Sequence, residues 1–129
     1  MASSVAAVVD ASAVLAWLQD ERGSDEAEPL LMEGFIGAAN WSEVLQKARQ
    51  HGIEAEAVSR LLASFGLAIS DVTRTDAEGA AELWQRGSPL SLADRLCLAL
   101  GIRLGLPVAT MDGAWSKIAH GPPVIVLTR

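Results

Sequence analysis

Along the chain, apolar runs of strand length alternate with longer segments in which apolar residues recur every three or four positions. The short runs predict five β-strands, near residues 5–9, 35–38, 67–69, 108–110 and 124–127. The longer period predicts helices near residues 12–19, 28–32, 40–51, 54–65, 75–85 and 91–104, with a short one after residue 112. Alternation of this kind is typical of a mostly parallel sheet flanked by helices, so we expect an α/β fold.

The predicted helix ends carry local signals. Two stretches match the capping box, in which an acid at the third helical position pairs with a Ser or Thr before the helix. They are Thr75 with Glu78, and Ser91 with Asp94. Asn40 is a good N-cap residue for the helix that follows the second predicted strand.

Length and composition then limit the organisation. With 129 residues, the chain fits a single domain, residues 1–129, large enough for a real core. Half of the residues are hydrophobic, which is high for a small domain and indicates apolar surface reserved for a partner. We therefore expect at least a dimer.

Charge and cysteine content narrow the function classes. The net charge of −6 gives no general basic face for nucleic acid, so any such binding has to be local or mediated by a metal. The single cysteine, Cys97, lies in an apolar stretch, which excludes an internal disulfide and suits a reducing cytoplasm. No apolar stretch approaches the roughly 18 residues of a membrane span, and the N-terminus lacks a basic start, so we predict a cytoplasmic protein away from membranes.

Four acidic residues stand where the surrounding sequence is apolar or opens a helix. Asp10 and Asp112 follow predicted strands, and Glu43 lies in the first turn of the helix after another strand. Ligands of open α/β sheets bind beyond the carboxyl ends of the strands, so these three acids are expected at one edge. Asp94 lies in a helix that follows a helix, and its placement at the same edge is an inference.

Each acid also has a local explanation. Glu43 with Asn40, and Asp94 with Ser91, could serve only as capping boxes, while Asp112 could cap its short helix and Asp10 could belong to a turn. Capping and metal binding are compatible, because a carboxylate has two oxygens. If the acids meet, an all-oxygen set without histidine or cysteine favours Mg²⁺ or Mn²⁺ over zinc.

Four motifs occur in order along the chain. They are Val-Val-Asp-Ala-Ser-Ala at residues 8–13, Asn-Trp-Ser-Glu-Val at 40–44, Leu-Ser-Leu-Ala-Asp at 90–94, and Ala-Thr-Met-Asp at 109–112 followed by Trp115. Together they resemble the PIN domain, specifically the VapC toxins of VapBC toxin–antitoxin systems. The resemblance spans essentially the whole chain.

The resemblance implies a Mg²⁺- or Mn²⁺-dependent endoribonuclease that cuts structured RNA, in loops of tRNA or ribosomal RNA, and so inhibits translation. It implies a homodimer that a VapB-type antitoxin holds inactive in a larger complex. The metal-binding and catalytic residues would be Asp10, Glu43, Asp94 and Asp112. Ser12, Asn40 and Thr110 would not bind the metal directly but would support these acids or a phosphate.

Residues that would hold RNA are less defined. Gly113 stands where many relatives carry a basic or larger polar residue, so a phosphate contact is missing there. The candidate cations are Lys47, Arg49, Arg86, Arg95 and Lys117. Trp84 fits an apolar helix face, and Trp115 is expected in the core rather than stacked on a base.

Other function classes remain open to test. A phosphatase of haloacid type needs a second aspartate two residues after the first, where this chain has Ser12. A phospho-accepting receiver needs an acid directly before the aspartate, where this chain has Val9, and a lysine after a late strand. These departures speak against a metal-dependent phosphohydrolase, whereas a catalytically silent protein-binding module stays possible.

Overall fold

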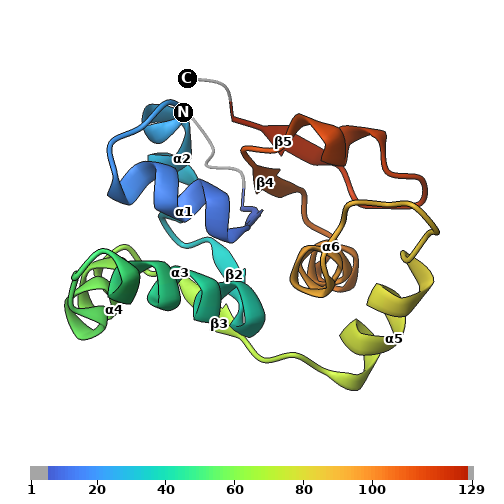
Figure 1. Cartoon of the computed structure of the whole chain (residues 1–129), viewed down its shortest axis with the longest axis horizontal. Helices are drawn as coiled ribbons and strands as arrows, with labels where there is room; N and C mark the ends of the chain where they lie inside the picture. Colours follow the sequence, from blue (N-terminus) through green and yellow to red (C-terminus); the bar gives the residue numbers. More distant parts are fainter. Residues whose placement is uncertain (1–5, 128–129) are drawn as a thin grey trace.

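The computed structural model of the chain describes residues 6–127 and contains one sheet with helices on both faces (Figure 1). Its strand order is β3-β2-β1-β4-β5, and each neighbouring pair is parallel. The strands are β1 (Val8–Val9), β2 (Phe35–Gly37), β3 (Ala68–Ser70), β4 (Val108–Thr110) and β5 (Val124–Val126). The predicted α/β class with a parallel sheet of about five strands is confirmed.

Helices connect the strands and cover the sheet. They are α1 (Ala11–Leu18), α2 (Ser24–Leu31), α3 (Ala38–Gln50), α4 (Ala55–Ser64), α5 (Arg74–Glu82), α6 (Leu92–Leu104) and the 3-10 helix η1 (Gly113–Lys117). In Figure 1, α1 and α2 lie on one side of the sheet, while α6, backed by α5, lies on the other. No helix within residues 6–127 is both long and apolar enough to cross a membrane.

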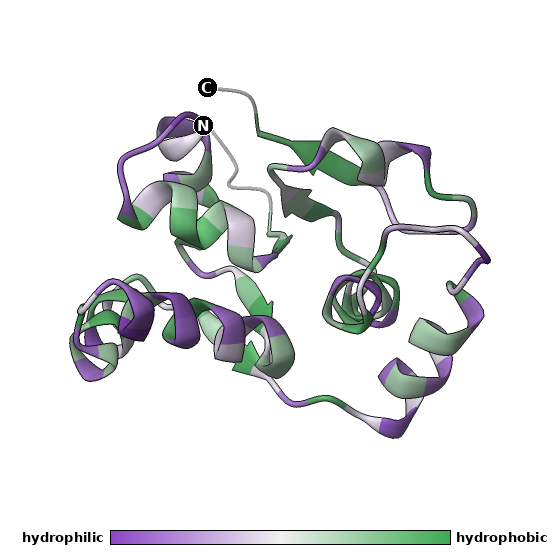
Figure 2. Cartoon of the chain, in the orientation of Figure 1, coloured by the Kyte–Doolittle hydropathy of each residue, from purple (hydrophilic) through white to green (hydrophobic). Residues whose placement is uncertain are grey.

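The strands divide their side chains between two apolar cores because successive residues of a strand point to opposite faces. Val9 and Ala109 belong to the core under α1 to α4, whereas Val8 and Val108 belong to the core under α6. Figure 2 shows the strands mostly green, that is apolar, and the helices with both green and purple positions. Strands buried on both faces explain why the sequence shows continuous apolar runs.

Three predicted helix starts are wrong. Helix α2 begins at Ser24, four residues before the expected start, with Gly23 in a left-handed conformation before it. Helix α3 begins at Ala38, directly after β2, so Asn40 lies inside the first turn and does not cap. The capping box of α5 uses Thr73 and Asp76 instead of Thr75 and Glu78.

The remaining boundaries agree more closely. The capping box of Ser91 and Asp94 is confirmed, and so is a short helix with Asp112 at its N-cap. Gly105 ends α6 with φ 67°, as a left-handed cap requires. The predicted first strand includes Val5, which lies outside the described residues.

Candidate active site

Two predicted site residues lie where the strand order reverses. The chain builds β1, β2 and β3 outward in one direction and then returns to place β4 on the other side of β1. In such sheets the crevice beyond the carboxyl ends of the two central strands is the usual ligand site. Asp10 directly follows β1, and Asp112 follows β4 after one residue.

Asp10 is held in place by hydroxyl groups from both strand ends. Its side chain is 6% exposed and caps α1 by accepting a hydrogen bond from Ala13 N at 3.0 Å. The Ser12 hydroxyl donates to Oδ1 and the Thr110 hydroxyl donates to Oδ2, each at 2.7 Å. These hydroxyls also accept from the backbone after β4, Ser12 from Met111 N and Thr110 from Asp112 N. The two side chains therefore tie both oxygens of Asp10 to the end of β4.

Asn40 connects the helices that carry Glu43 and Asp94. It is 1% exposed, and its amide Nδ2 donates to Glu43 Oε1 and to the carbonyl oxygen of Ala93, each at 3.3 Å. Because both neighbours are acceptors, the amide nitrogen has to face them. Asn40 Oδ1 is then buried with no hydrogen-bond partner among the described residues. Asn40 thus sets the spacing between the first turn of α3 and the start of α6.

The acids at this edge interact electrostatically. Burial raises the pKa of Asp10, the negative charge of Asp94 raises it further, and the three hydrogen bonds oppose this effect. Burial and then Asp94 raise the pKa of Glu43, against the Asn40 hydrogen bond and the charge of Lys47. Buried Cys97, placed in the core as predicted, has a pKa well above its ordinary value from burial, then from Asp10, Asp94 and Glu43. These three carboxylates therefore all lie near enough to Cys97 to act on its thiol.

Asp112 has a different environment. Its side chain is exposed and accepts a hydrogen bond from Ala114 N at 2.9 Å, which caps η1. Its backbone N–H, through Thr110, connects it to Asp10. The structure thus places Asp94 close enough to Asp10 and Glu43 to raise the pKa of each. Asp112 is connected to Asp10 only through its backbone N–H, which donates to the Thr110 hydroxyl.

The donor chemistry of this edge fits a hard divalent cation. The groups are carboxylates, which such ions prefer, and the pKa values of Asp10 and Glu43 are raised mainly by burial and further by the charge of Asp94, which a bound cation would oppose. Within residues 6–127, however, no three His, Cys, Asp or Glu side chains converge closely enough to form a finished metal site. The residues that could hold an ion after side-chain adjustment are Asp10, Glu43 and Asp94, with Asp112 beside them.

The structure separates the candidate cations. Arg95 is already used inside the protein, because its Nη1 donates to the carbonyl of Ala80 at 2.8 Å. Lys47 lies one turn after Glu43 on α3, in a groove of about 560 Å³ that Ser12 and Met111 also line. Arg86 and Lys117 line a separate cleft.

Two aromatic predictions have opposite outcomes. Trp115 is 2% exposed and belongs to the core, as predicted. The prediction for Trp84 is wrong: α5 ends at Glu82, and Trp84 is 54% exposed, with the Arg86 guanidinium 5.7 Å from the centre of its ring. The sequence signal that could have indicated this is the following Gln85-Arg86-Gly87-Ser88-Pro89 stretch, which is typical of a turn.

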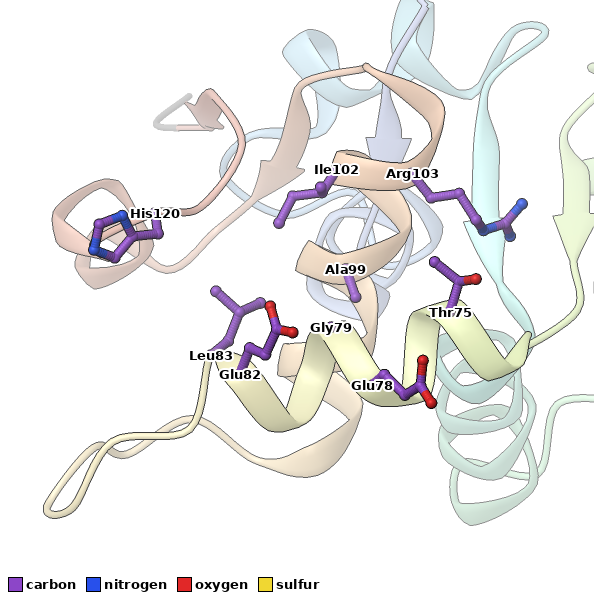
Figure 3. A pocket seen from close by; sticks show the side chains of 9 residues that line it. All are labelled: Thr75, Glu78, Gly79, Glu82, Leu83, Ala99, Ile102, Arg103 and His120. Carbon is purple, nitrogen blue, oxygen red and sulfur yellow. The ribbon is translucent and has the colours of Figure 1, made fainter.

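A further cavity lies between α5 and α6, away from the acids described above (Figure 3). Its volume is about 410 Å³, and its lining combines apolar side chains such as Leu83 and Ile102 with the carboxylates of Glu78 and Glu82. His120, in the turn before β5, also lies at the lining of this cavity. Neither Asp10 nor Asp94 lines it.

Several solved structures have a similar fold. A chain in a toxin–antitoxin complex from Klebsiella pneumoniae matches with a TM-score of 0.75 and 22% identity, covering 96% of this chain and 99% of the other. VapC20 of Mycobacterium tuberculosis, described as a sarcin–ricin loop cleaving toxin, matches with a TM-score of 0.71 and 17% identity over 88% and 95% of the two chains. VapBC2 from Rickettsia felis, bound to a DNA fragment from its promoter, matches with a TM-score of 0.72 and 15% identity over 95% and 98%.

At these identities the likeness concerns the fold. Comparison with curated protein sequences gave no match. The sequence itself matches the PIN domain family over residues 7–121, which includes all four acids and nearly all described elements. The chain therefore belongs to the PIN domain family.

Proposed function

We propose that this PIN domain is a metal-dependent endoribonuclease that acts as the toxin of a VapBC-type pair. The observation that carries the proposal is the placement of Asp10, Glu43 and Asp94 at the point where the strand order reverses, with Thr110 bonded to Asp10 and Asn40 joining Glu43 to the backbone beside Asp94. Carboxylates crowded in this way gain free energy from a divalent cation, with Mg²⁺ or Mn²⁺ as the expected ion. The protein of similar fold from M. tuberculosis is described as a sarcin–ricin loop cleaving toxin, which supports RNA as the substrate class.

The roles of the residues follow from their contacts. Ser12 and Thr110 orient the Asp10 carboxylate, and Asn40 orients Glu43. Asp94 has one oxygen, Oδ2, bonded to Ser91 N, which leaves the other oxygen available. A cation held by these acids would lower the pKa of a water, neutralise phosphate charge and stabilise the leaving oxygen. Hydrolysis of this kind leaves 5′-phosphate and 3′-hydroxyl ends.

Partners belong to the same proposal. The Klebsiella and Rickettsia structures of similar fold are toxin–antitoxin complexes, so we assign a VapB-type antitoxin to this chain. The homodimer is part of the proposal on the family resemblance alone. Large apolar side chains on the surface provide area that such partners would cover. They include Met32, Ile53, Leu61, Ile69 and Val72.

Asp94→Asn is the sharpest test of the activity. Asparagine keeps an oxygen that can accept from Ser91 N, so the helix cap survives while the charge is lost. With Mn²⁺ and structured RNA, we expect cleavage by the variant to fall roughly 100-fold or more, equivalent to about 3 kcal/mol of transition-state stabilisation. Asp25→Asn, in the exposed first turn of α2, is the matched control and should cleave normally.

Sequencing of the RNA ends and light scattering complete the experiment. The proposal fails if the wild-type protein does not cut RNA in Mg²⁺ or Mn²⁺, or if Asp94→Asn cuts as well as Asp25→Asn. Products that end in a cyclic phosphate would exclude hydrolysis through a metal-activated water. Light scattering of the same preparation should give the mass of two chains.

A further inference from the structure

A cleft formed by the loop between α5 and α6 and by η1 has the chemistry of a nucleotide site. Its volume is about 280 Å³, and none of the described residues that line it is acidic. Two of them, Arg86 and Lys117, are cations, and Gln85 and Ser88 add neutral polar groups. The chain has a net charge of −6, and this local excess of positive charge favours an anionic ligand.

The cleft lies between the segments that carry two of the candidate acids. Leu90 lines it and directly precedes Ser91, whose capping box holds Asp94. Ala114 lines the opposite side and donates its N–H to Asp112. Figure 1 shows the α5–α6 loop passing beside the C-terminal part of the chain that contains η1. A nucleic-acid strand bound in the cleft would therefore continue toward Asp94 and Asp112.

The local structure holds the two cations in position. Ser88 N donates to the carbonyl of Gln85, and Gly87 adopts φ 80°, the sign that the third residue of a type II turn requires. Arg86 therefore projects from the tip of a defined turn. On the other side, buried Trp115 anchors η1, and Lys117 ends that helix.

An aromatic ring lies beside the cleft: Trp84 does not line it but contacts Arg86, which does. Trp84 is 54% exposed, and Arg86 lies over its ring at 5.7 Å, although the ring contributes little to the core. An exposed ring beside cations is the combination with which proteins bind unpaired bases, since a base stacks on the ring while the cations contact phosphates. By contrast, the cavity in Figure 3 is lined by two carboxylates, Glu78 and Glu82, and by one arginine, Arg103, which already pairs with Asp76, so it offers no excess of positive charge to a phosphate.

We propose that Trp84, Arg86 and Lys117 form a subsite for an unpaired RNA nucleotide adjacent to the catalytic acids. The inference rests on the proposed ribonuclease function and adds the residues that select an unpaired strand. Trp84 stacks on the base, and Arg86 and Lys117 contact the flanking phosphates. Single-stranded loops fit this subsite, whereas bases inside a duplex are not available to the ring.

Binding without cleavage tests the subsite separately from the activity. The probe is a short fluorescein-labelled single-stranded RNA, whose anisotropy is measured with the full chain in EDTA. We expect Trp84→Ala, Arg86→Ala and Lys117→Ala each to weaken RNA binding at least about 5-fold. For Trp84 this factor corresponds to the low end of the free energy with which a base stacks on an aromatic ring. Arg60→Ala, at an exposed cation on α4 (side chain 67% exposed), is the matched control and should bind like wild type.

The salt dependence identifies each role. Arg86→Ala and Lys117→Ala should each reduce the slope of log affinity against log salt by about 0.7, the value for one phosphate contact of a single strand. Trp84→Ala should leave the slope unchanged, and its effect should vanish on an abasic strand of the same length. In the cleavage assay, the three variants should raise KM more than they lower kcat.

Each outcome has a defined meaning. Unchanged RNA affinity in all three variants overturns the subsite, even if Asp94→Asn abolishes cleavage and the proposed activity stands. Tighter binding of polyglutamate than of RNA, with no loss in Trp84→Ala, overturns it in favour of a protein partner. Weakened RNA binding in the variants supports the subsite. This holds even if the wild-type chain cuts no RNA, a result that would overturn the proposed activity alone.

Discussion

At the scale of single residues, Asn40 offers the clearest test of how the acids are positioned. It touches Glu43 and the backbone just before Asp94, so it acts through these acids and does not need to contact substrate. We expect Asn40→Ala to raise the Mn²⁺ concentration for half-maximal cleavage by roughly 10- to 100-fold, as is usual for groups that orient metal ligands. Activity at saturating Mn²⁺ should recover in part. A metal requirement equal to that of wild type would contradict the positioning role.

Asn40→Asp is the informative companion to the alanine variant. An aspartate would place its carboxylate oxygens against Glu43 Oε1 and the Ala93 carbonyl, where no donor remains. Its cost in the free energy of unfolding should therefore exceed that of alanine, which only removes the two bonds. Thermal unfolding of the two variants, compared at pH 7, measures the difference.

Some residues of the site could be placed from the sequence, and others could not. Asp10 and Asp112 were expected at the sheet edge because an acid after a buried strand has few other places to lie, and the structure has both there. The role of Asn40 as a bridge between helices was not predictable, because its capping pattern was equally good and only tertiary contact places Ala93 beside it. The exposure of Trp84 depended on where α5 ends, which a period of apolar residues defines poorly.

At the scale of elements, one ion pair fastens α5 to α6. Arg103 donates to both carboxylate oxygens of Asp76, at 2.7 and 3.1 Å, and the Asp76 side chain is 3% exposed. Asp76→Asn should lower the free energy of unfolding by about 2–3 kcal/mol, since it removes charged hydrogen bonds from a buried position. Glu78→Gln, whose ion pair with Arg74 is exposed, should cost less than about 0.5 kcal/mol. Chemical denaturation of both variants measures the two values.

The pH dependence of this pair has a defined sign. Burial acts to raise the pKa of Asp76, but hydrogen bonds from Arg103 and from the backbone of Thr73 outweigh it, and the pKa lies below its ordinary value. A lowered pKa in the folded state contributes stability above the ordinary value of about 3.9, and this contribution is lost as pH falls through the lower folded value. The difference between wild type and Asp76→Asn should thus be full at pH 7 and shrink below about pH 4. A difference that stays constant down to acid pH would contradict this account.

The boundary of α5 shows why elements were predicted better than their ends. Thr73 with Asp76 and Thr75 with Glu78 match the same capping pattern two residues apart, so local sequence cannot choose between them. Arg103 decides the choice, because it pairs with Asp76 from another helix. Contacts distant in sequence therefore fixed the start of the helix.

At the scale of the whole molecule, the spacing of apolar residues along the sequence cannot predict the order of the strands in the sheet. The apolar runs predicted parallel strands, but the placement of β4 beside β1, and not beside β3, follows from how α5 and α6 cross back over the sheet. Only this order brings the end of β4 to Asp10, where Thr110 can donate to it. It also places α6, and with it Asp94, across from Glu43.

The same topology makes metal binding a property of the folded chain. Asp10, Glu43 and Asp94 belong to segments far apart in sequence, so an unfolded chain cannot present them together, and a bound cation should stabilise the fold. At a Mn²⁺ concentration 100 times the dissociation constant, the gain in the free energy of unfolding is about 2.7 kcal/mol, which would raise the Tm by roughly 8 °C for a domain of this size.

The Asp94→Asn variant should lose most of this shift in Tm. Asp25→Asn should keep it, and Asp112→Asn should lose less than Asp94→Asn, because Asp112 caps η1 and is connected to Asp10 only through its backbone N–H. Thermal shift with Mn²⁺ and with EDTA measures each case; equal shifts in wild type and Asp94→Asn would place the ion elsewhere and remove the physical basis for a nuclease centre at this edge.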